Sequence, residues 1–166
     1  TVPKWSVGYF GFRGDGPGAV ELPQLALNYE EKVRKRQPVA ALEELIALVE
    51  EKLSCRVSDC WANKFNDGSH FIDWHQDRYG VDIAVLTLGG SRKVEFRKKA
   101  GLMHKAKLPH ISIEPKSGDL YYFSTKMDKK HEHRVPAVEY PSSVPMRLSF
   151  VFFIHNAVLP STGIVQ

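Results

Sequence analysis

From Arg56 onward the chain is a row of short apolar segments separated by turn residues, and this pattern restricts the fold most strongly. The segments are rich in β-branched and aromatic residues, and Gly, Asn or Asp residues fall between them. Short strands behind one or two supporting helices favour an α+β fold, mainly β, of the double-stranded β-helix (jelly-roll) type. We expect the strands at residues 59–65, 82–88, 93–98, 110–114, 119–123 and 147–155.

One amphipathic helix is expected before the strands, over residues 38–54. Pro38 suits the first position of a helix, and charged residues fall outside one apolar stripe. We assign this helix to the scaffold and residues 56–155 to the jelly-roll core. The stripe consists of Leu42, Leu45, Ile46, Val49 and Leu53.

Composition predicts a single soluble domain over residues 1–166. The 166 residues are 43% hydrophobic and 25% charged, which is ordinary for a globular protein. No apolar run reaches membrane-spanning length, so we expect no membrane segment. Two cysteines, Cys55 and Cys60, are too few for a disulfide framework and favour free thiols in a reducing compartment. We therefore expect an intracellular monomer, in the nucleus or the cytoplasm.

Candidate metal ligands occur in His75-Gln76-Asp77 and in the stretch from His131 to His133. Side chains two residues apart project from the same side of an extended strand, so His75 and Asp77 can bind one ion together. We expect His133 as the third ligand, with His131 as its rival. Two His and one carboxylate are typical of non-haem Fe(II) oxygenases. Zinc accepts the same donors, so the triad alone leaves the metal open.

The His-x-Asp tripeptide is short and therefore weak evidence alone, but its context is more specific. The series of segments resembles the AlkB-like family of Fe(II)/2-oxoglutarate dioxygenases over residues 60–155, and more loosely over residues 1–12. This resemblance implies Fe(II), 2-oxoglutarate and O2 as reactants, and oxidation of a substrate C–H bond. Five segments occur in the family's order, at residues 63–77, 86–97, 117–123, 133–136 and 147–152.

Arg147 is the expected anchor for 2-oxoglutarate. Its planar guanidinium can donate two parallel hydrogen bonds to a carboxylate, which a lysine cannot do. Arg147 stands at the start of an apolar strand, where an unpaired charge is costly, so a bound anion is one explanation and an acidic neighbour is the other. Ser149 lies two residues further on the same face and can donate a further bond. Asn63 resembles the family's other 2-oxoglutarate contact.

Three aromatic residues are candidate substrate contacts. Trp74 and Tyr79 flank the metal ligands and can stack on a flat substrate or simply pack in the core. Tyr9 lies in the aromatic-rich stretch of residues 1–20, which the resemblance implies is a possible substrate lid, although such aromatics can also pack as a flap on the core.

The sequence departs from the family at three positions. Phe65 stands where relatives usually have Tyr, and Phe153 replaces their second Arg. Tyr79 falls where relatives often carry acidic residues that handle cationic methylated bases. Repair of N-methylated cationic bases is therefore in doubt for this chain.

Charge and resemblance together favour a nucleic-acid partner. A formal net charge of +4 and a pI near 9.0 are compatible with a polyanion. The leading expectation is oxidative demethylation of a modified nucleic acid, with DNA and RNA undecided. The alternatives are the same chemistry on a protein or a small molecule, a weakly catalytic nucleic-acid-binding module, and a zinc-binding structural domain. Succinate formation and metal analysis distinguish these possibilities.

Overall fold

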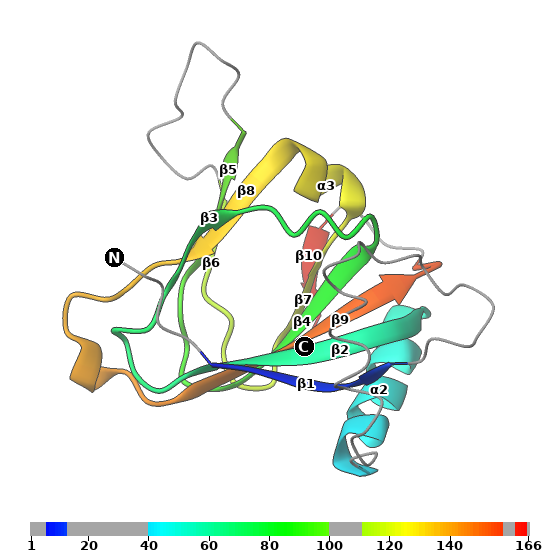
Figure 1. Ribbon diagram of the computed structural model, residues 1–166, viewed down its shortest axis with the longest axis horizontal. Helices are drawn as coiled ribbons and strands as arrows, with labels where there is room; N and C mark the ends of the chain where they lie inside the picture. The colour runs from blue at the N-terminus through cyan, green and yellow to red at the C-terminus, as the bar shows by residue number, and fades with distance from the viewer. Residues whose placement is uncertain (1–5, 13–39, 100–110, 158–161, 166) are drawn as a thin grey trace.

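The computed structural model of the chain describes residues 6–12, 40–99, 111–157 and 162–165 (Figure 1). No helix among these residues is both long enough and apolar enough to cross a membrane. The elements are β1 (Ser6–Phe12), α2 (Ala40–Leu53), β2 (Arg56–Phe65), β3 (Ile72–His75), β4 (Asp82–Gly89), β5 (Val94–Lys98), β6 (Ile111–Ile113), β7 (Leu120–Phe123), α3 (Thr125–Lys130), β8 (His131–Val135), the 3-10 helix η1 (Pro141–Ser143), β9 (Arg147–His155) and β10 (Thr162–Val165).

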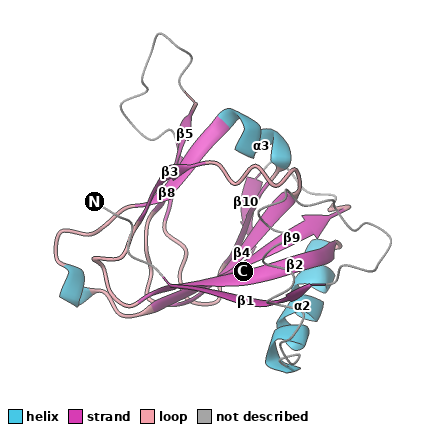
Figure 2. Cartoon of the chain, viewed as in Figure 1, coloured by secondary structure: helices cyan, strands magenta, loops and turns pink. Residues whose placement is uncertain are grey.

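The strands form two antiparallel sheets. The larger sheet has the order β1-β2-β9-β4-β7-β10, and the smaller sheet has the order β3-β8-β5-β6. Neighbours in space are mostly distant in sequence, as in a jelly roll, where the chain crosses repeatedly between two sheets. Figures 1 and 2 show α2 on the side of the larger sheet that faces away from the smaller one. The expected fold class, α+β and mainly β, is confirmed.

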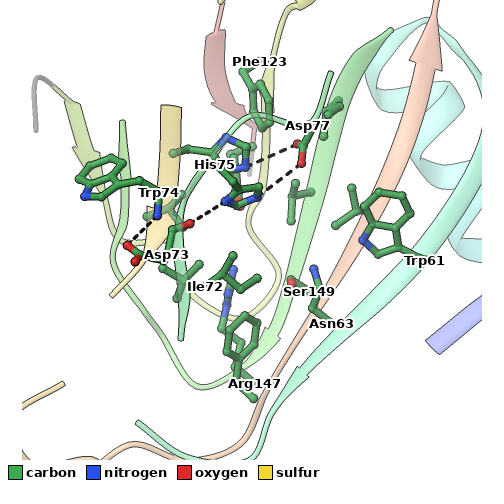
Figure 3. Close-up of a pocket in the computed structure, with 18 of the residues that line it drawn as sticks. Trp61, Asn63, Ile72, Asp73, Trp74, His75, Asp77, Phe123, Arg147 and Ser149 are labelled. Carbon is green, nitrogen blue, oxygen red and sulfur yellow. Dashed lines mark hydrogen bonds and ion pairs between the residues drawn. The ribbon is translucent and has the colours of Figure 1, made fainter. Parts of the chain in front are cut away.

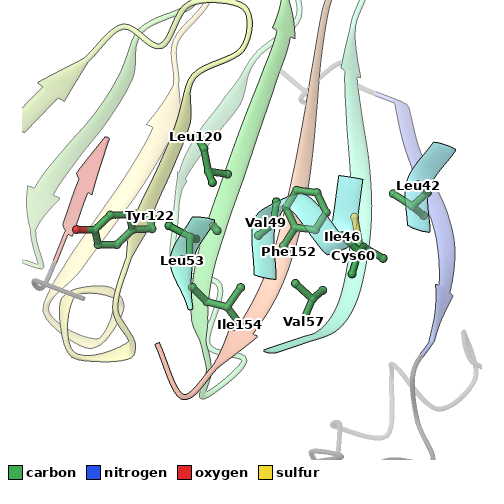
Figure 4. Close-up of a cluster of buried hydrophobic side chains, with 11 residues drawn as sticks. Leu42, Ile46, Val49, Leu53, Val57, Cys60, Leu120, Tyr122, Phe152 and Ile154 are labelled. Atoms are coloured by element: carbon green, nitrogen blue, oxygen red, sulfur yellow. The ribbon is translucent and has the colours of Figure 1, made fainter. Parts of the chain in front are cut away.

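Strand β9 explains how both faces of the larger sheet are buried. Phe152 and Ile154 pack with α2 in one apolar cluster (Figure 4), while Val151 and Phe153 belong to a second cluster with residues of the smaller sheet. Alternate side chains of a strand point to opposite faces, so a strand covered on both faces needs apolar residues throughout. The uninterrupted apolar run in β9 is therefore a consequence of its central position.

Most of the expected elements are present. The helix over residues 38–54 corresponds to α2, and each of the six expected strands overlaps an observed one. The sequence did not predict β1, β8, β10 or α3, and it predicted β3 only as an extended segment at His75. Residues 6–12, within the expected lid, form β1 and pair with β2 at the edge of the larger sheet. The rest of residues 1–20 lies outside the described residues, and the lid role stays a prediction.

Both cysteines are free thiols, as expected. Cys60 is buried in the cluster beneath α2, and Cys55 is half-buried at the end of that helix. Burial, with a smaller contribution from the charge of Glu50, raises the pKa of Cys55 to about 11. A thiol with such a pKa stays protonated at neutral pH, which makes it a poor nucleophile and a poor metal ligand.

Candidate metal centre

His75 and His133 lie opposite each other on neighbouring strands of the smaller sheet. In the antiparallel pairing of β3 with β8, His75 lies opposite His133, and their ring centroids are 4.1 Å apart. Asp77 does not continue the strand, because β3 ends at His75. Arg78 has a left-handed φ of 56°, which turns the chain immediately after Asp77. The expectation that His75 and Asp77 share one extended strand is therefore wrong for Asp77.

The turn nevertheless brings the Asp77 carboxylate between the two imidazoles (Figure 3). Nε2 of His75 lies 3.5 Å from one carboxylate oxygen, and Nε2 of His133 lies 3.5 Å from the other. One possible ligand atom from each of the three residues lies within 4.8 Å of the other two. Donors that bind one ion at about 2.0–2.2 Å lie roughly 3.0–3.5 Å apart, so only small shifts would close these three atoms around a metal.

The pKa shifts of the triad follow from burial and from the charges within it. Burial raises the pKa of Asp77, but His133 and His75 outweigh burial, so the net shift is downward. For His133, burial lowers the pKa and outweighs the attraction of Asp77. For His75, burial also lowers the pKa, yet the hydrogen bond and charge of Asp77 shift it upward overall. An ionised carboxylate beside a neutral His133 is the form that metal binding requires.

A hydrogen bond orients the His75 ring. Its Nδ1 lies 2.8 Å from the backbone oxygen of Asp73. Because a carbonyl oxygen only accepts, Nδ1 carries the proton in this bond, and in a neutral ring Nε2 then has the lone pair that a metal ion needs. The neutral form of His75, held by this bond, has the tautomer that a metal ligand requires.

His131, the rival third ligand, is directed elsewhere. It stands at the junction of α3 and β8, and its Nδ1 lies 3.1 Å from the backbone oxygen of Met127. His131 therefore contacts the backbone of α3, whereas His133 lies beside Asp77.

A cavity of about 450 Å³ extends from the triad between the two sheets. Figure 3 shows His75 and Asp77 toward one end and Arg147 toward the other. The wall is mostly apolar, with a few polar groups, as in many small-molecule sites. Its polar side chains outside the triad include Asn63, Tyr79, Tyr121, Arg147 and Ser149.

Arg147 is a buried cation with unused hydrogen-bond donors. Its residue is 1% exposed, and its Nη2 donates to the Thr87 hydroxyl at 3.3 Å. Its Nε and Nη1 have no hydrogen-bond partner among the described residues. Burial lowers the pKa of Arg147, and the neighbouring Tyr121 offsets only part of that effect. A buried guanidinium with two unsatisfied donors is costly unless an anion binds to it.

Strand register places Asn63 and Ser149 in the same cavity. Asn63 lies opposite Ser149 in the pairing of β2 with β9, and both line the cavity with Arg147. On the other side, Gly89 of β4 lies opposite Arg147. Gly89 has a φ of 83°, and a Cβ there would lie 2.3 Å from the Met146 oxygen. Glycine therefore permits the close approach that seats the start of β9.

Sequence analysis missed the role of a second buried arginine, Arg92. It is 1% exposed and donates to the backbone oxygens of Asp67 at 3.0 Å and His70 at 2.9 Å, and also to that of Pro136. These bonds tie the segment before β3 to the segment after β8, so Arg92 braces the two strands that carry the histidines. Its place in the family-like segment 86–97 was the only signal in the sequence.

Tyr79 belongs to an aromatic wall of the cavity. Its ring centroid lies 5.2 Å from that of Trp61 and 4.7 Å from that of Phe153. Sequence analysis assigned no role to Trp61, which lines the cavity from β2. Tyr9 lies opposite Trp61 in the pairing of β1 with β2, but its side chain is outside the described part of the chain. Substrate contacts by Tyr79 and Tyr9 stay predictions.

Trp74 lies between two arginines. The guanidinium carbons of Arg97 and Arg134 lie 4.2 and 4.5 Å from its ring centroid. Its ring points away from the triad (Figure 3), as the alternation of neighbouring side chains along β3 requires. A substrate contact by Trp74 stays a prediction, and its observed contacts are cation–π interactions.

Comparison with known proteins finds likenesses among solved structures but none among family models or curated sequences. No protein-family model matches the chain, and no curated protein matches its sequence. A solved structure described as "The structure of OsALKBH1" matches with a TM-score of 0.49 and 16% sequence identity. The match covers 71% of this chain and 65% of that chain, so it spans less than two thirds of the length of that protein.

Proposed function

We propose that this chain is an Fe(II)- and 2-oxoglutarate-dependent dioxygenase. The observation that carries the proposal is the presence of a His-Asp-His triad and a buried, incompletely bonded arginine in one cavity. The triad can hold a metal ion, and the guanidinium has free donors that an anion would fill. A cosubstrate that is both an anion and a metal ligand meets the two requirements together.

The donor set of the triad fits Fe(II). His75 and His133 would each supply a ring nitrogen, and Asp77 would supply a carboxylate oxygen, which suits a borderline metal. Three protein ligands leave positions open for other molecules. Zinc fits the same donors, so the support for Fe(II) comes from the cavity that Arg147 lines and from the resemblance in sequence order rather than from the triad alone.

The far end of the cavity fits a dicarboxylate. Arg147 would bind one carboxylate through its free Nε and Nη1, with Ser149 and Asn63 as neighbouring polar groups. Phe65, which replaces the family's usual Tyr, lies beneath the guanidinium, with 5.2 Å between its ring centroid and Cζ of Arg147. It supplies a cation–π contact where a Tyr would supply a hydroxyl.

The chemistry proposed belongs to the bound metal and cosubstrate, which together activate O2, release CO2 and succinate, and oxidise a substrate C–H bond. This chain's own residues bind, orient and shield these reactants. Arg147 anchors the carboxylate, the hydrogen bond from His75 to Asp73 fixes the ligand tautomer, and the apolar cavity wall excludes water. When the oxidised carbon is an N-methyl group, the product sheds formaldehyde.

Turnover in air tests this proposal. Purified protein with Fe(II) and 2-oxoglutarate is expected to form succinate in air and none under nitrogen. Metal analysis of the protein as isolated should find iron in preference to zinc. Absence of succinate under every substrate tested, with tight zinc binding, would instead support the zinc-binding structural domain.

A modified nucleic acid is the substrate class that we favour, because a basic hollow adjoins the metal centre. This hollow has a volume of about 260 Å³, and its lining includes Arg78, Lys99 and Lys129. Its acidic residue, Asp128, uses both carboxylate oxygens to accept backbone hydrogen bonds. Arg78 directly follows the ligand Asp77, so phosphates bound in the hollow would lie next to the reaction site.

Charge reversal in the hollow tests this substrate class. The double substitution Lys99→Glu with Lys129→Glu is expected to weaken binding of single-stranded oligonucleotides. The slope of log affinity against log salt should become shallower by about 0.7 for each phosphate that the variant no longer neutralises. Fluorescence anisotropy over a salt series measures both quantities. Lys52→Glu with Lys116→Glu is the control with the same change of net charge, since both lysines are exposed and neither lines the hollow. Equal losses of affinity in both proteins would argue against the hollow.

Tyr79 is expected to favour neutral over cationic modified bases. A carboxylate at this position would attract a cationic base, whereas a phenol is uncharged at neutral pH and can stack on a neutral one. Tyr79→Asp should therefore shift the activity ratio toward cationic substrates, with Tyr79→Phe as the control that keeps the ring. Mass spectrometry of methylated oligonucleotides measures methyl loss. An unchanged ratio in Tyr79→Asp, or a wild type that prefers the 1-methyladenine type, would contradict this interpretation.

The same screen addresses the competing functions. Succinate formed without methyl loss from any oligonucleotide would direct the search to a protein or small-molecule substrate. Oligonucleotide binding without succinate would indicate a nucleic-acid-binding module that has kept the fold.

A further inference from the structure

The position of Asp77 is not explained by the strand that precedes it. Strand β3 ends at His75, and the next residues form an irregular segment, called the Asp77 turn here, in which Arg78 has a φ of 56°. A non-glycine residue in the left-handed region persists only where neighbouring groups hold it. Some other part of the molecule must therefore fix this turn, and with it the carboxylate of Asp77.

Asp128 of α3 makes the required contacts. Its residue is 7% exposed, and one carboxylate oxygen accepts a hydrogen bond from the backbone N–H of Asp77 at 3.1 Å. Its other oxygen accepts from the backbone N–H of Arg78 at 3.0 Å. The backbone oxygen of Asp128 accepts from the side-chain amide of Gln76. One residue thus binds three consecutive residues of the turn.

The short helix that carries Asp128 is itself held at its start. The Ser124 hydroxyl accepts from the backbone N–H of Met127 at 3.2 Å. Asp82 of β4 accepts from the backbone N–H of Thr125 at 2.7 Å and from its hydroxyl at 2.9 Å. Helix α3 is therefore fixed to the larger sheet, and its capped start gives Asp128 a defined position.

The same helix leads directly into the strand of the third ligand. Helix α3 ends at Lys130, and β8, which carries His133, begins at the next residue. Asp128 therefore joins the Asp77 turn to the element from which His133 extends. Any displacement of Asp128 would change the separation between the two sides of the triad. Metal sites are sensitive to such supporting bonds, whose loss typically lowers metal affinity by about 10–100-fold.

We propose that Asp128 is a positioning residue for the metal centre, whose carboxylate fixes the turn that aims Asp77 between His75 and His133. This inference rests on the proposed function, because it presupposes that the triad binds a metal. Asp128 does not touch the metal in this account. Both of its carboxylate oxygens are used by backbone N–H groups, so Asp77 remains the carboxylate that is available as a ligand.

The test is the affinity of the protein for Mn(II), measured by calorimetry without 2-oxoglutarate or turnover. Asp128→Ala removes both bonds to the turn and is expected to weaken Mn(II) binding by about 10–100-fold. Asp128→Asn keeps one acceptor oxygen but turns an amide toward the second N–H, so an intermediate loss is expected. The absorption spectrum of bound Co(II) should also change in both variants, because it reports ligand geometry, whereas a purely structural role would leave it unchanged.

Asp119→Ala is the matched control. The Asp119 carboxylate also accepts a backbone hydrogen bond, from Lys116 at 2.9 Å, but in the turn before β7. Its removal should lower the melting temperature without changing Mn(II) affinity. If Asp128→Ala does not fold, the result for Asp128→Asn decides. Folded Asp128 variants that bind Mn(II) within twofold of wild type, with an unchanged Co(II) spectrum, overturn this inference alone. Wild type that binds no more tightly than His75→Ala overturns the metal centre and this inference together.

Discussion

Asp77→Ala is expected to abolish both tight metal binding and conversion of 2-oxoglutarate, while the protein stays folded. The substitution removes the one anionic donor of the triad and leaves two imidazoles 4.1 Å apart between ring centroids. Because loss of supporting bonds alone costs about 10–100-fold in metal affinity, loss of a ligand should cost more than about 100-fold. His75→Ala is expected to have the same effect. Calorimetric titration with Mn(II) and an assay for succinate measure the two losses.

The two histidines of β8 provide the control. His133→Ala should match the loss seen in Asp77→Ala, whereas His131→Ala should keep metal affinity near that of wild type. The reason is that Nδ1 of His131 lies 3.1 Å from the Met127 oxygen, at the end of α3. If instead His131→Ala loses activity and His133→Ala keeps it, the third ligand has been assigned to the wrong residue.

Arg147→Ala is expected to weaken 2-oxoglutarate binding by a factor of tens to thousands. A charge-assisted contact that is shielded from water contributes about 2–5 kcal/mol when one partner is removed. Arg147→Lys should be nearly as damaging, because an ammonium group cannot reproduce two parallel hydrogen bonds to a carboxylate. Calorimetric titration of 2-oxoglutarate into the Mn(II)-loaded variants, without O2, measures the affinity apart from turnover.

Stability distinguishes loss of a binding group from damage to the fold. Without a bound anion, Arg147 is a buried cation, and two of its nitrogens have no hydrogen-bond partner among the described residues. Because such a charge is costly to bury, Arg147→Ala should lower the free energy of unfolding of the ligand-free protein by less than is expected for a core residue. Arg97→Ala is the matched control, because Arg97 is paired with Glu132 on the outer face of the smaller sheet. Unchanged 2-oxoglutarate affinity in Arg147→Ala would contradict the assignment.

The parts of the fold that could be predicted are those in which periodic burial leaves a pattern. The stripe from Leu42 to Leu53 predicted α2, since each member packs on the larger sheet. The apolar run of β9 predicted a strand at residues 147–155, and the structure shows that it is covered on both faces. Arg147, beside that run, lies in the interior at 1% exposure, and its role in binding an anion stays a prediction.

The parts that could not be predicted depend on contacts between residues distant in sequence. Strand β8, His131–Val135, has one apolar residue in its five positions and therefore shows no strand pattern. Asp128 lies in a six-residue helix of mostly polar residues, and its hydrogen bonds reach the backbone about 50 positions earlier. The bonds from Arg92 likewise join the segment before β3 to the segment after β8. Backbone acceptors and donors leave no trace in the sequence.

Binding of 2-oxoglutarate with and without metal tests most directly the claim that the triad and Arg147 serve one site. A 2-oxo acid can offer two adjacent oxygens to a metal, whereas glutarate has the same two carboxylates without the oxo group. We expect Mn(II) to increase the affinity for 2-oxoglutarate markedly in calorimetric titrations without O2, and to leave the affinity for glutarate nearly unchanged. Asp77→Ala should remove the difference between the two acids. Equal affinity for 2-oxoglutarate with and without Mn(II) in a wild type that binds the metal would contradict the account.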